Sequence, residues 1–169
     1  MVKAAFFFST ILFVIIADQW TKFLVLEHFD YGESVVMIQN FFNFTYVRNT
    51  GAAFGFMATA NPSFRVPFFL IVPIVAMVVL GFLYRDLPPH AKWRSLSLGL
   101  VSGGAVGNLI DRIRLGYVVD FLDFHWKTDY FFPAFNIADA AICVGVTVLL
   151  LSTVSSRETH ADASNPVRN

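Results

Sequence analysis

The sequence has little charge, and that charge is balanced. Of its 169 residues only 14% are charged and 56% are hydrophobic, against about 25% and roughly 45–50% in an ordinary soluble domain. Twelve basic and twelve acidic residues cancel to a formal net charge of zero, so the chain has no basic surplus for neutralising a phosphate backbone. The composition argues against a soluble domain and against a nucleic-acid-binding protein.

Several kinds of site are also missing. Cys143 is the single cysteine, which excludes an internal disulfide and a multi-cysteine metal site. The chain has no His-Glu-x-x-His helix, no Gly-x-Ser-x-Gly turn and no phosphate-binding glycine loop. A hard-cation site at Asp120, Asp123 and Asp129 is conceivable because such ions prefer clustered carboxylates. We nevertheless expect no metal and no cofactor.

Four apolar segments dominate what is present. A helix needs about 20 mostly apolar residues to cross the hydrocarbon core of a membrane, and the four segments approach this length: residues 4–26, 64–84, 93–115 and 137–154. They predict an all-α polytopic membrane protein with a single domain over residues 1–156 and a disordered polar tail over residues 157–169. No small-residue cleavage site follows the first segment, which favours an uncleaved anchor over a signal peptide.

Basic residues near the ends of these segments predict the orientation. The connection between the second and third segments carries Arg85, Lys92 and Arg94, and the chain ends carry Lys3, Arg157 and Arg168. Because such residues stay in the cytoplasm, we expect both termini there and residues 27–63 and 116–136 on the outer side. This asymmetry is weakened by basic residues at or beyond the outer ends, among them Arg48, Arg112, Arg114 and Lys127.

The first outer segment favours β-structure. Residues 36–56 are rich in β-formers with interleaved polar residues, and Asn49-Thr50-Gly51 is a turn signal, so a short strand or hairpin is predicted. The aromatic residues of both outer segments suit the membrane–water interface. An aromatic belt that only anchors the protein would explain most of them.

Polar residues inside the apolar segments are costly unless they are paired or line a cavity. Asp18 and Lys22 stand four residues apart on one helix face and predict an ion pair, most simply a structural one. The third segment has small residues at every fourth position, which predict a groove for close helix packing: Ser95, Gly99, Gly103 and Gly107.

The end of the third segment concentrates polar residues before Gly116, a plausible helix C-terminus. Asn108 and Arg112 share a helix face, and Asp111 could neutralise a guanidinium. A structural network that fastens this helix end explains these residues at least as well as a catalytic role does.

Two aspartates occur where the third and fourth segments meet the outer side. Asp120 has an apolar setting, and Asp139 stands in the first turn of a helix that Asn136 could cap. Antiparallel neighbouring helices would bring both carboxylates to one depth. Two carboxylates that share a site retain one proton near neutral pH and can hold a water between an acid and a base, as in an aspartic peptidase. The alternatives are a proton or ion transporter, with carboxylates nearer the bilayer centre, and a non-enzymatic scaffold.

Four sequence blocks together resemble those of lipoprotein signal peptidase (signal peptidase II), a family of bacterial membrane aspartic peptidases. In chain order they are D-Q-x-x-K at 18–22, R-N-T-G-A-A-F-G at 48–55, G-G-x-x-G-N-x-x-D-R-x-x-x-G-x-V-x-D-F at 103–121 and F-N-x-A-D at 135–139. The resemblance implies four transmembrane helices in the inner membrane, an extracytoplasmic β-cradle, a short amphipathic helix over the active site, and both termini in the cytoplasm.

The resemblance also implies the chemistry. It places the catalytic dyad on Asp120 and Asp139, with supporting residues at Asn49, Asn108, Arg112 and Asn136 and a further motif pair at Asp18 and Lys22. Similar enzymes remove the signal peptide from a diacylglyceryl-modified prolipoprotein, cutting before the lipidated cysteine and using no metal. The expected partners are such substrates and membrane lipid, and we expect a monomer. The apolar setting of Asp120 favours it as the acid, and the helix N-terminus favours ionised Asp139 as the base.

Overall fold

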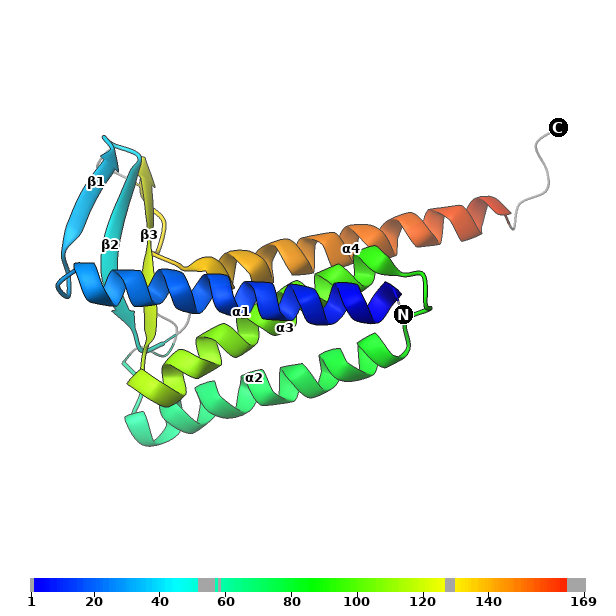
Figure 1. The fold of residues 1–169 in the computed structure, drawn as a ribbon, viewed down its shortest axis with the longest axis horizontal. Helices are drawn as coiled ribbons and strands as arrows, with labels where there is room; N and C mark the ends of the chain where they lie inside the picture. The colour runs from blue at the N-terminus through cyan, green and yellow to red at the C-terminus, as the bar shows by residue number, and fades with distance from the viewer. Residues whose placement is uncertain (1, 52–56, 58, 127–129, 164–169) are drawn as a thin grey trace.

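A computed structural model describes residues 2–51, 57, 59–126 and 130–163. Its elements are α1 (Val2–His28), β1 (Ser34–Ile38), β2 (Phe42–Asn49), α2 (Pro62–Arg85), α3 (Lys92–Leu115), β3 (Val118–Trp126), β4 (Tyr130–Phe131) and α4 (Ile137–Ala163). The helices run side by side with a small sheet across one end, while the N-terminus and the α2–α3 connection lie at the other end (Figure 1). The predicted separation of the outer segments from the termini is therefore present in the fold.

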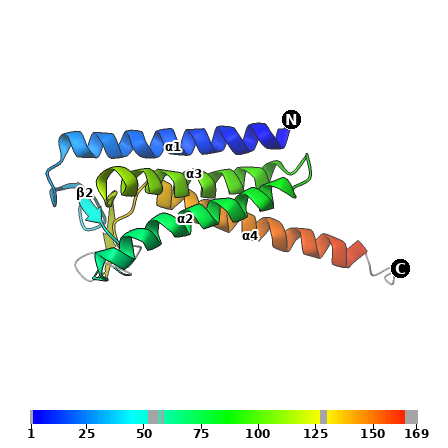
Figure 2. The same ribbon diagram turned by 90° about the horizontal axis from the view of Figure 1, so that it is seen from below.

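The helix α3 is the centre of the bundle. It contacts α1, α2 and α4. In the view of Figure 2, α3 lies between α1 at the top and α2 below. Its inner positions are small or polar and buried, whereas α1 and α2 expose large apolar side chains such as Phe13 and Phe64. Among the described residues, α1 and α2 are long and apolar enough to cross a membrane, and the apolar part of α4 is shorter. This arrangement, polar inside and apolar outside, is that of a membrane protein.

The predicted small-residue groove on α3 receives α1. A Cβ atom added at Gly99 would lie 2.9 Å from the backbone oxygen of Phe7, and one at Gly103 would lie 2.8 Å from Cβ of Val14. A Cβ at Gly104 would overlap the backbone oxygen of Ala138 in α4. Both neighbours of α3 therefore approach its backbone at distances that only glycine permits.

Matched glycine substitutions test this packing. We expect Gly104→Ala to lower the free energy of unfolding by about 1–3 kcal/mol, as overpacking of a close contact does, because the added methyl group pushes α4 away from α3. Gly81 in α2 has no atom within 4 Å of an added Cβ, so Gly81→Ala should leave stability unchanged or raise it slightly. Thermal unfolding of both variants in detergent compares them directly, and equal midpoints would contradict the tight α3–α4 contact.

The sheet is antiparallel with the strand order β1-β2-β3-β4, so the helical fold carries the small β-sheet that was expected beside the helices. The predicted hairpin is correct, but its turn lies between Ile38 and Phe42, where Asn40 adopts a positive φ of 60°, a conformation that asparagine tolerates. The predicted turn at Asn49 instead ends β2, where the Asn49 side chain accepts a hydrogen bond from the Gly51 amide at 3.0 Å. The implied short amphipathic helix is not among the described residues.

Two helix ends bear on the predictions. Gly116 ends α3 in the left-handed conformation with φ 80°, as expected for this residue. The helix α4 extends to Ala163, so the tail predicted as disordered is helical over residues 157–163. A helix already nucleated within the bundle lengthens at little further cost, even through polar residues, and composition alone does not reveal this.

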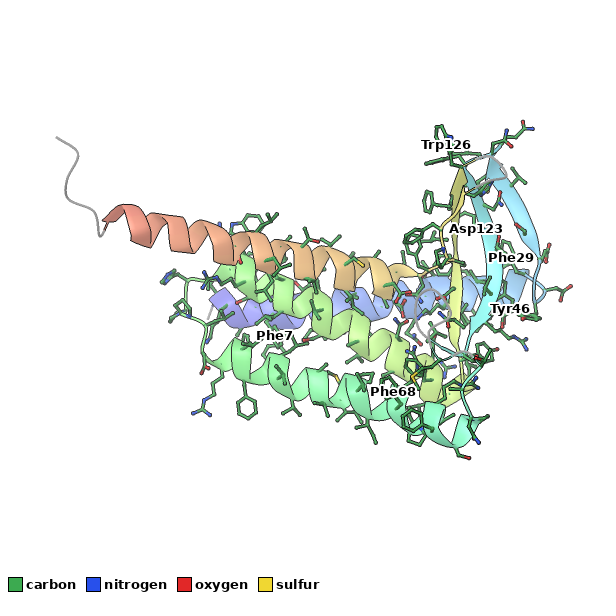
Figure 3. All side chains as sticks on the ribbon, turned by 180° about the vertical axis from the view of Figure 1, so that it is seen from behind. Phe7, Phe29, Tyr46, Phe68, Asp123 and Trp126 are labelled. Atoms are coloured by element: carbon green, nitrogen blue, oxygen red, sulfur yellow. The ribbon has the colours of Figure 1, made fainter. Side chains whose placement is uncertain are left out.

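A small apolar cluster holds the sheet on the bundle. Val25 at the end of α1 packs with Tyr46 of β2 and with Val119 and Phe121 of β3. Figure 3 shows the labelled Tyr46 and Phe29 at this junction. Because β3 follows α3 and leads back toward α4, this cluster fixes the strand that carries Asp120 above the first turn of α4.

Candidate active site

Asp120 lies on β3 and is 1% exposed. Both of its oxygens accept amide hydrogen bonds: Nδ2 of Asn49 donates to Oδ2 at 2.9 Å, and Nδ2 of Asn136 donates to Oδ1 at 2.7 Å. The pairing of β2 with β3 places Asn49 beside this residue. The Asn49 and Asn136 side chains thus fix the orientation of the Asp120 carboxyl group.

Asp139 is half-buried in the first turn of α4. Its backbone N–H donates to Oδ1 of Asn136 at 3.0 Å, and its own Oδ2 accepts from the Asn136 backbone N–H at 3.3 Å. This reciprocal pair is a capping box, so the predicted cap by Asn136 is confirmed. Nδ2 of Asn108 donates to the other oxygen of Asp139 at 2.7 Å.

The two carboxyl groups are brought to one place by shared amide partners. Asn136 contacts both, and its Nδ2 also contacts Oδ1 of Asn108 at 3.2 Å. Burial, together with the nearby negative charge of Asp139, raises the pKa of Asp120 from 3.8 to about 7, against the opposing effect of its two amide bonds. The arrangement can hold one proton between two acids near neutral pH.

A buried ammonium group stands behind the dyad. Lys22, 2% exposed, lies 2.9 Å from Oδ2 of Asp18 and 2.9 Å from Oδ2 of Asp111, so the predicted pair with Asp18 is present and Asp111 joins it. Nζ of Lys22 also donates to Oδ1 of Asn108 at 3.0 Å. Because an ammonium group can only donate, the Asn108 oxygen must face Lys22 and its NH₂ group must face Asp139.

Asp18 connects this network to α4. Its Oδ1 accepts from the backbone N–H of Ala138 at 3.0 Å, one residue before Asp139. Gln19, which was not among the residues expected at the site, donates to Asp18 and Asp111 at 3.1 and 2.9 Å. Its only sequence signal is its place in the D-Q-x-x-K block.

The expectation that Asp111 neutralises a guanidinium is wrong. Asp111 is taken by Lys22, by Gln19 and by the backbone N–H of Val119 at 3.1 Å. Arg112 instead donates to the backbone oxygens of Asn108 and Gly51 at 3.2 and 3.1 Å. Its guanidinium lies 5.0 Å from the ring centroid of Phe69. The nearest neighbour in sequence is not the partner because the lysine of α1 approaches the same face of α3.

A cavity of about 430 Å³ opens beside Asp139. Polar side chains of Asn49, Asn108 and Arg112 lie on its wall with Asp139, and the rest of the wall is apolar: Val118, Phe132, Pro133, Ala134, Phe135, Ala140, Ile142 and Cys143. The sequence offered no signal for the apolar part, because apolar residues are common throughout the chain. The cavity can hold an apolar ligand with one polar segment directed at the dyad.

The conceivable cation site finds no support in the described part of the chain. Asp123 accepts from Nδ2 of Asn43 at 3.3 Å and from Oγ1 of Thr45 at 3.2 Å. It stands three residues from Asp120 on one strand, so the two point to opposite faces. Asp129 lies outside the described residues.

Comparison with known proteins identifies the family. The model of the family described as "Signal peptidase (SPase) II" matches residues 10–155. A lipoprotein signal peptidase of Syntrophotalea carbinolica is 51% identical over 139 residues, covering 82% of this chain and 84% of the relative. Another, from Geobacter sulfurreducens, is 44% identical over 155 residues, covering 92% and 95%. A solved bacterial membrane enzyme has a TM-score of 0.78 at 31% identity, covering 96% of this chain and 92% of its own. The chain belongs to the signal peptidase II family of aspartic peptidases, as its motifs predicted.

Proposed function

We propose that this protein is an intramembrane aspartic endopeptidase that removes the signal peptide from diacylglyceryl-modified prolipoproteins, cutting before the lipidated cysteine. The observation that carries the proposal is the pair Asp120 and Asp139, joined through Asn136 and open to an apolar cavity. The relatives bearing the name lipoprotein signal peptidase support the substrate class. The comparisons give no support to the transporter alternative.

The two aspartates take different roles in the proposed reaction. Asp139 is the base, because its carboxyl group stands at the N-terminus of α4, beside the cavity, and each of its oxygens accepts an N–H hydrogen bond. Asp120 is the acid, because burial raises its pKa to about 7. Asp139 removes a proton from a water as the oxygen attacks the scissile carbonyl carbon, and Asp120 donates its proton to the carbonyl oxygen. Collapse of the resulting diol breaks the C–N bond. Asp139 passes the proton that it took from water to the leaving nitrogen, and Asp120 takes a proton back from a diol hydroxyl. The products are a carboxylic acid and an amine, and both aspartates return to their starting states.

Asn49 and Arg112 are proposed to hold the substrate backbone. Both line the cavity beside Asp139, and both carry N–H donors that suit peptide carbonyl oxygens. A signal helix and two acyl chains held in the apolar part of the cavity would orient the peptide bond between them. Remote binding of this kind would select one peptide bond for attack by the dyad.

We further propose that all four helices span the inner membrane of a bacterium, with both termini in the cytoplasm and the sheet and dyad on the outer side. The basic residues Arg85, Lys92 and Arg94 lie at the end opposite the sheet, in agreement with the positive-inside rule. The apolar outer surfaces of α1 and α2 face lipid, and α3 is enclosed by its neighbours. One chain contains the complete set of site residues, which favours a monomer.

Cleavage by the purified protein tests the proposal. A prolipoprotein carrying the diacylglyceryl group should be cut before its cysteine in detergent or lipid vesicles. The same precursor without the lipid should be cut at least about 100-fold less efficiently, because lost remote binding energy appears in the rate. Equal cleavage of both precursors would contradict the lipidated substrate class, and cleavage of neither would contradict the proposed activity.

The raised pKa of Asp120 predicts the pH dependence of cleavage. Because the acid must carry a proton, kcat/KM should fall about tenfold per pH unit above pH 7. The hydrogen bond from Asn49 lowers this pKa, so Asn49→Ala should move the falling limb of the pH profile to higher pH as well as slow the reaction. A falling limb that does not move in this variant would contradict the assignment of Asp120 as the acid.

The raised pKa of Asp120 also affects folding stability. Its stabilising contribution is fully present below pH 3.8 and is lost as pH rises through about 7.

The single cysteine reports on the cavity. Cys143 is exposed on its wall, one helical turn from Asp139, so its alkylation by N-ethylmaleimide should fill part of the site and lower cleavage at least about tenfold. Cys143→Ala should be insensitive to the reagent. The matched control is the double variant Cys143→Ala with Val144→Cys. Val144 is exposed but does not line the cavity. Mass spectrometry confirms that each thiol is labelled. If the labelled control were inhibited to the same extent, the assignment of the cavity as the substrate site would be wrong.

A further inference from the structure

A second polar feature lies on the face of β2 opposite Asn49. Adjacent strand residues point to opposite faces, so Arg48 turns away from the dyad and shares a face with Tyr46. The Arg48 guanidinium carbon lies 4.7, 5.4 and 5.0 Å from the ring centroids of Tyr31, Tyr46 and Tyr117. We call these four residues the tyrosine cage. They come from the α1–β1 connection, from β2 and from the α3–β3 connection, so three separate segments place one cation.

The guanidinium is held but not neutralised. Its Nε donates to the hydroxyl of Tyr46 at 3.0 Å, and that hydroxyl is 3.0 Å from the hydroxyl of Tyr117. Within the described part of the chain, its two terminal nitrogens have no hydrogen-bond partner and no carboxylate pairs with it. The hydrogen bond to Tyr46 raises the pKa of this guanidinium, desolvation opposes the rise, and charge interactions with the three tyrosines add to it. Arg48 is therefore an exposed cation with two free terminal nitrogens, whose position is set by the three tyrosines.

Free donors of this kind suit a phosphate group. A guanidinium presents paired N–H groups that match phosphate oxygens, and stacking on aromatic rings leaves this edge available. The ring of Tyr31 contacts the guanidinium and the residue is 64% exposed, so the guanidinium is accessible from that side. Three rings and one hydroxyl hold the guanidinium in place, so little conformational entropy is lost on binding.

The position of the cage indicates the source of the phosphate. It lies at the sheet end of the bundle, where α1 and α3 end, and Arg48 pairs with Val119, the neighbour of Asp120. In the membrane orientation of the proposed function, this is the depth of the outer headgroups. We propose that the tyrosine cage binds the phosphate of an outer-leaflet phospholipid. The inference rests on the proposed membrane placement.

Such a lipid would set the depth of the dyad in the membrane. The diacylglyceryl group of the substrate lies among the same headgroups, so a phosphate held on Arg48 keeps Asp120 level with the bond to be cut. Loss of this contact would raise KM for substrate in a bilayer and leave kcat nearly unchanged. In detergent, where no headgroup plane exists, it would alter neither.

Lipid binding without substrate tests the site independently of catalysis. Dioleoylphosphatidylglycerol is titrated into the wild type in detergent, and bound lipid is counted by native mass spectrometry, with dioleoylglycerol as the phosphate-free lipid and inorganic phosphate as a competitor. We expect Arg48→Gln to weaken phosphatidylglycerol binding about tenfold and Arg48→Lys to weaken it less. Arg114→Gln removes an equal charge from the same end of the bundle and should bind as the wild type does. Asp139→Asn should also bind normally, so failure of the peptidase proposal would leave this result intact.

Three outcomes would overturn the inference. Arg48→Gln could bind phosphatidylglycerol as tightly as the wild type does, or the wild type could bind dioleoylglycerol as tightly as phosphatidylglycerol. Millimolar inorganic phosphate could also displace the lipid, which would make this a small-anion site. If Arg48→Gln does not fold, Tyr31→Leu removes an exposed wall of the cage and keeps the cation. It should weaken binding severalfold, and unchanged binding would count against the cage. In vesicles, Arg48→Gln should raise KM and leave kcat constant if the bound lipid sets the depth of the dyad. A purely structural role of Arg48 would instead lower both stability and kcat.

Discussion

Replacing Asp139 with asparagine should lower kcat at least about 1000-fold, the range lost when a positioned general base is removed. An amide cannot accept the proton of the attacking water. Its NH₂ group also meets an N–H donor in either orientation of the amide, because Asn108 donates to one carboxylate oxygen of Asp139 and the Asn136 backbone donates to the other. The loss is measured as single-turnover cleavage of a lipidated precursor, with folding checked by thermal unfolding.

Asp120→Asn should cause a loss of similar size, because an amide does not deliver a proton to the carbonyl oxygen. Asp123→Asn is the matched control on the same strand. Its carboxylate accepts from Asn43 and Thr45 on the other face of β3, so the control should retain cleavage. If either dyad variant cleaved as fast as the control, the aspartic mechanism proposed for this site would be wrong.

Lys22→Met should destabilise the protein by about 3–5 kcal/mol, the effect of leaving a buried charge without its partner. Asp18 and Asp111 are both paired with this ammonium group at 2.9 Å, and two buried carboxylates would face each other without it. The free energy of unfolding in a lipid-like detergent measures the loss. A variant as stable as the wild type would show that the network does not hold the helices together.

The double variant Lys22→Met with Asp111→Asn separates stability from catalysis. Removing one charge of each sign should restore much of the stability. We expect kcat to stay low, because the Asn108 amide is then free to present its oxygen to Asp139 and repel it. Recovery of both properties together would mean that Lys22 acts only as a structural counter-ion.

The sequence predicted the helices well because their signal is local. Long apolar runs predict the helices, and Gly116 predicts the C-terminus of α3, from neighbouring residues alone. The spacing of Asp18 and Lys22 is enough to predict their ion pair. The convergence of Asp120 and Asp139 followed from expected antiparallel neighbours, and the motif blocks supplied the supporting asparagines by resemblance.

The remaining contacts depend on the tertiary structure. Asp111 lies next to Arg112 in sequence, yet its partner is a lysine 89 positions away on another helix. The hairpin turn was misplaced because both Asn40 and Asn49 are good turn formers, and only the pairing of β2 with β3 decides between them. The apolar walls of the cavity and the tyrosine cage combine residues from distant segments, which no local pattern brings together.

The burial of α3 has a consequence for how this protein is made. Among the described helices, only α1 and α2 combine the length and apolarity needed to enter a membrane as single helices. The helix α3 carries Asn108, Asp111 and several glycines on its inner face. Its partners for those groups are on α1, which is synthesised earlier, and on α4, which is synthesised later. In the proposed membrane placement, we therefore expect stable insertion of α3 to wait for the last helix, so that a chain truncated before α4 does not assemble the site.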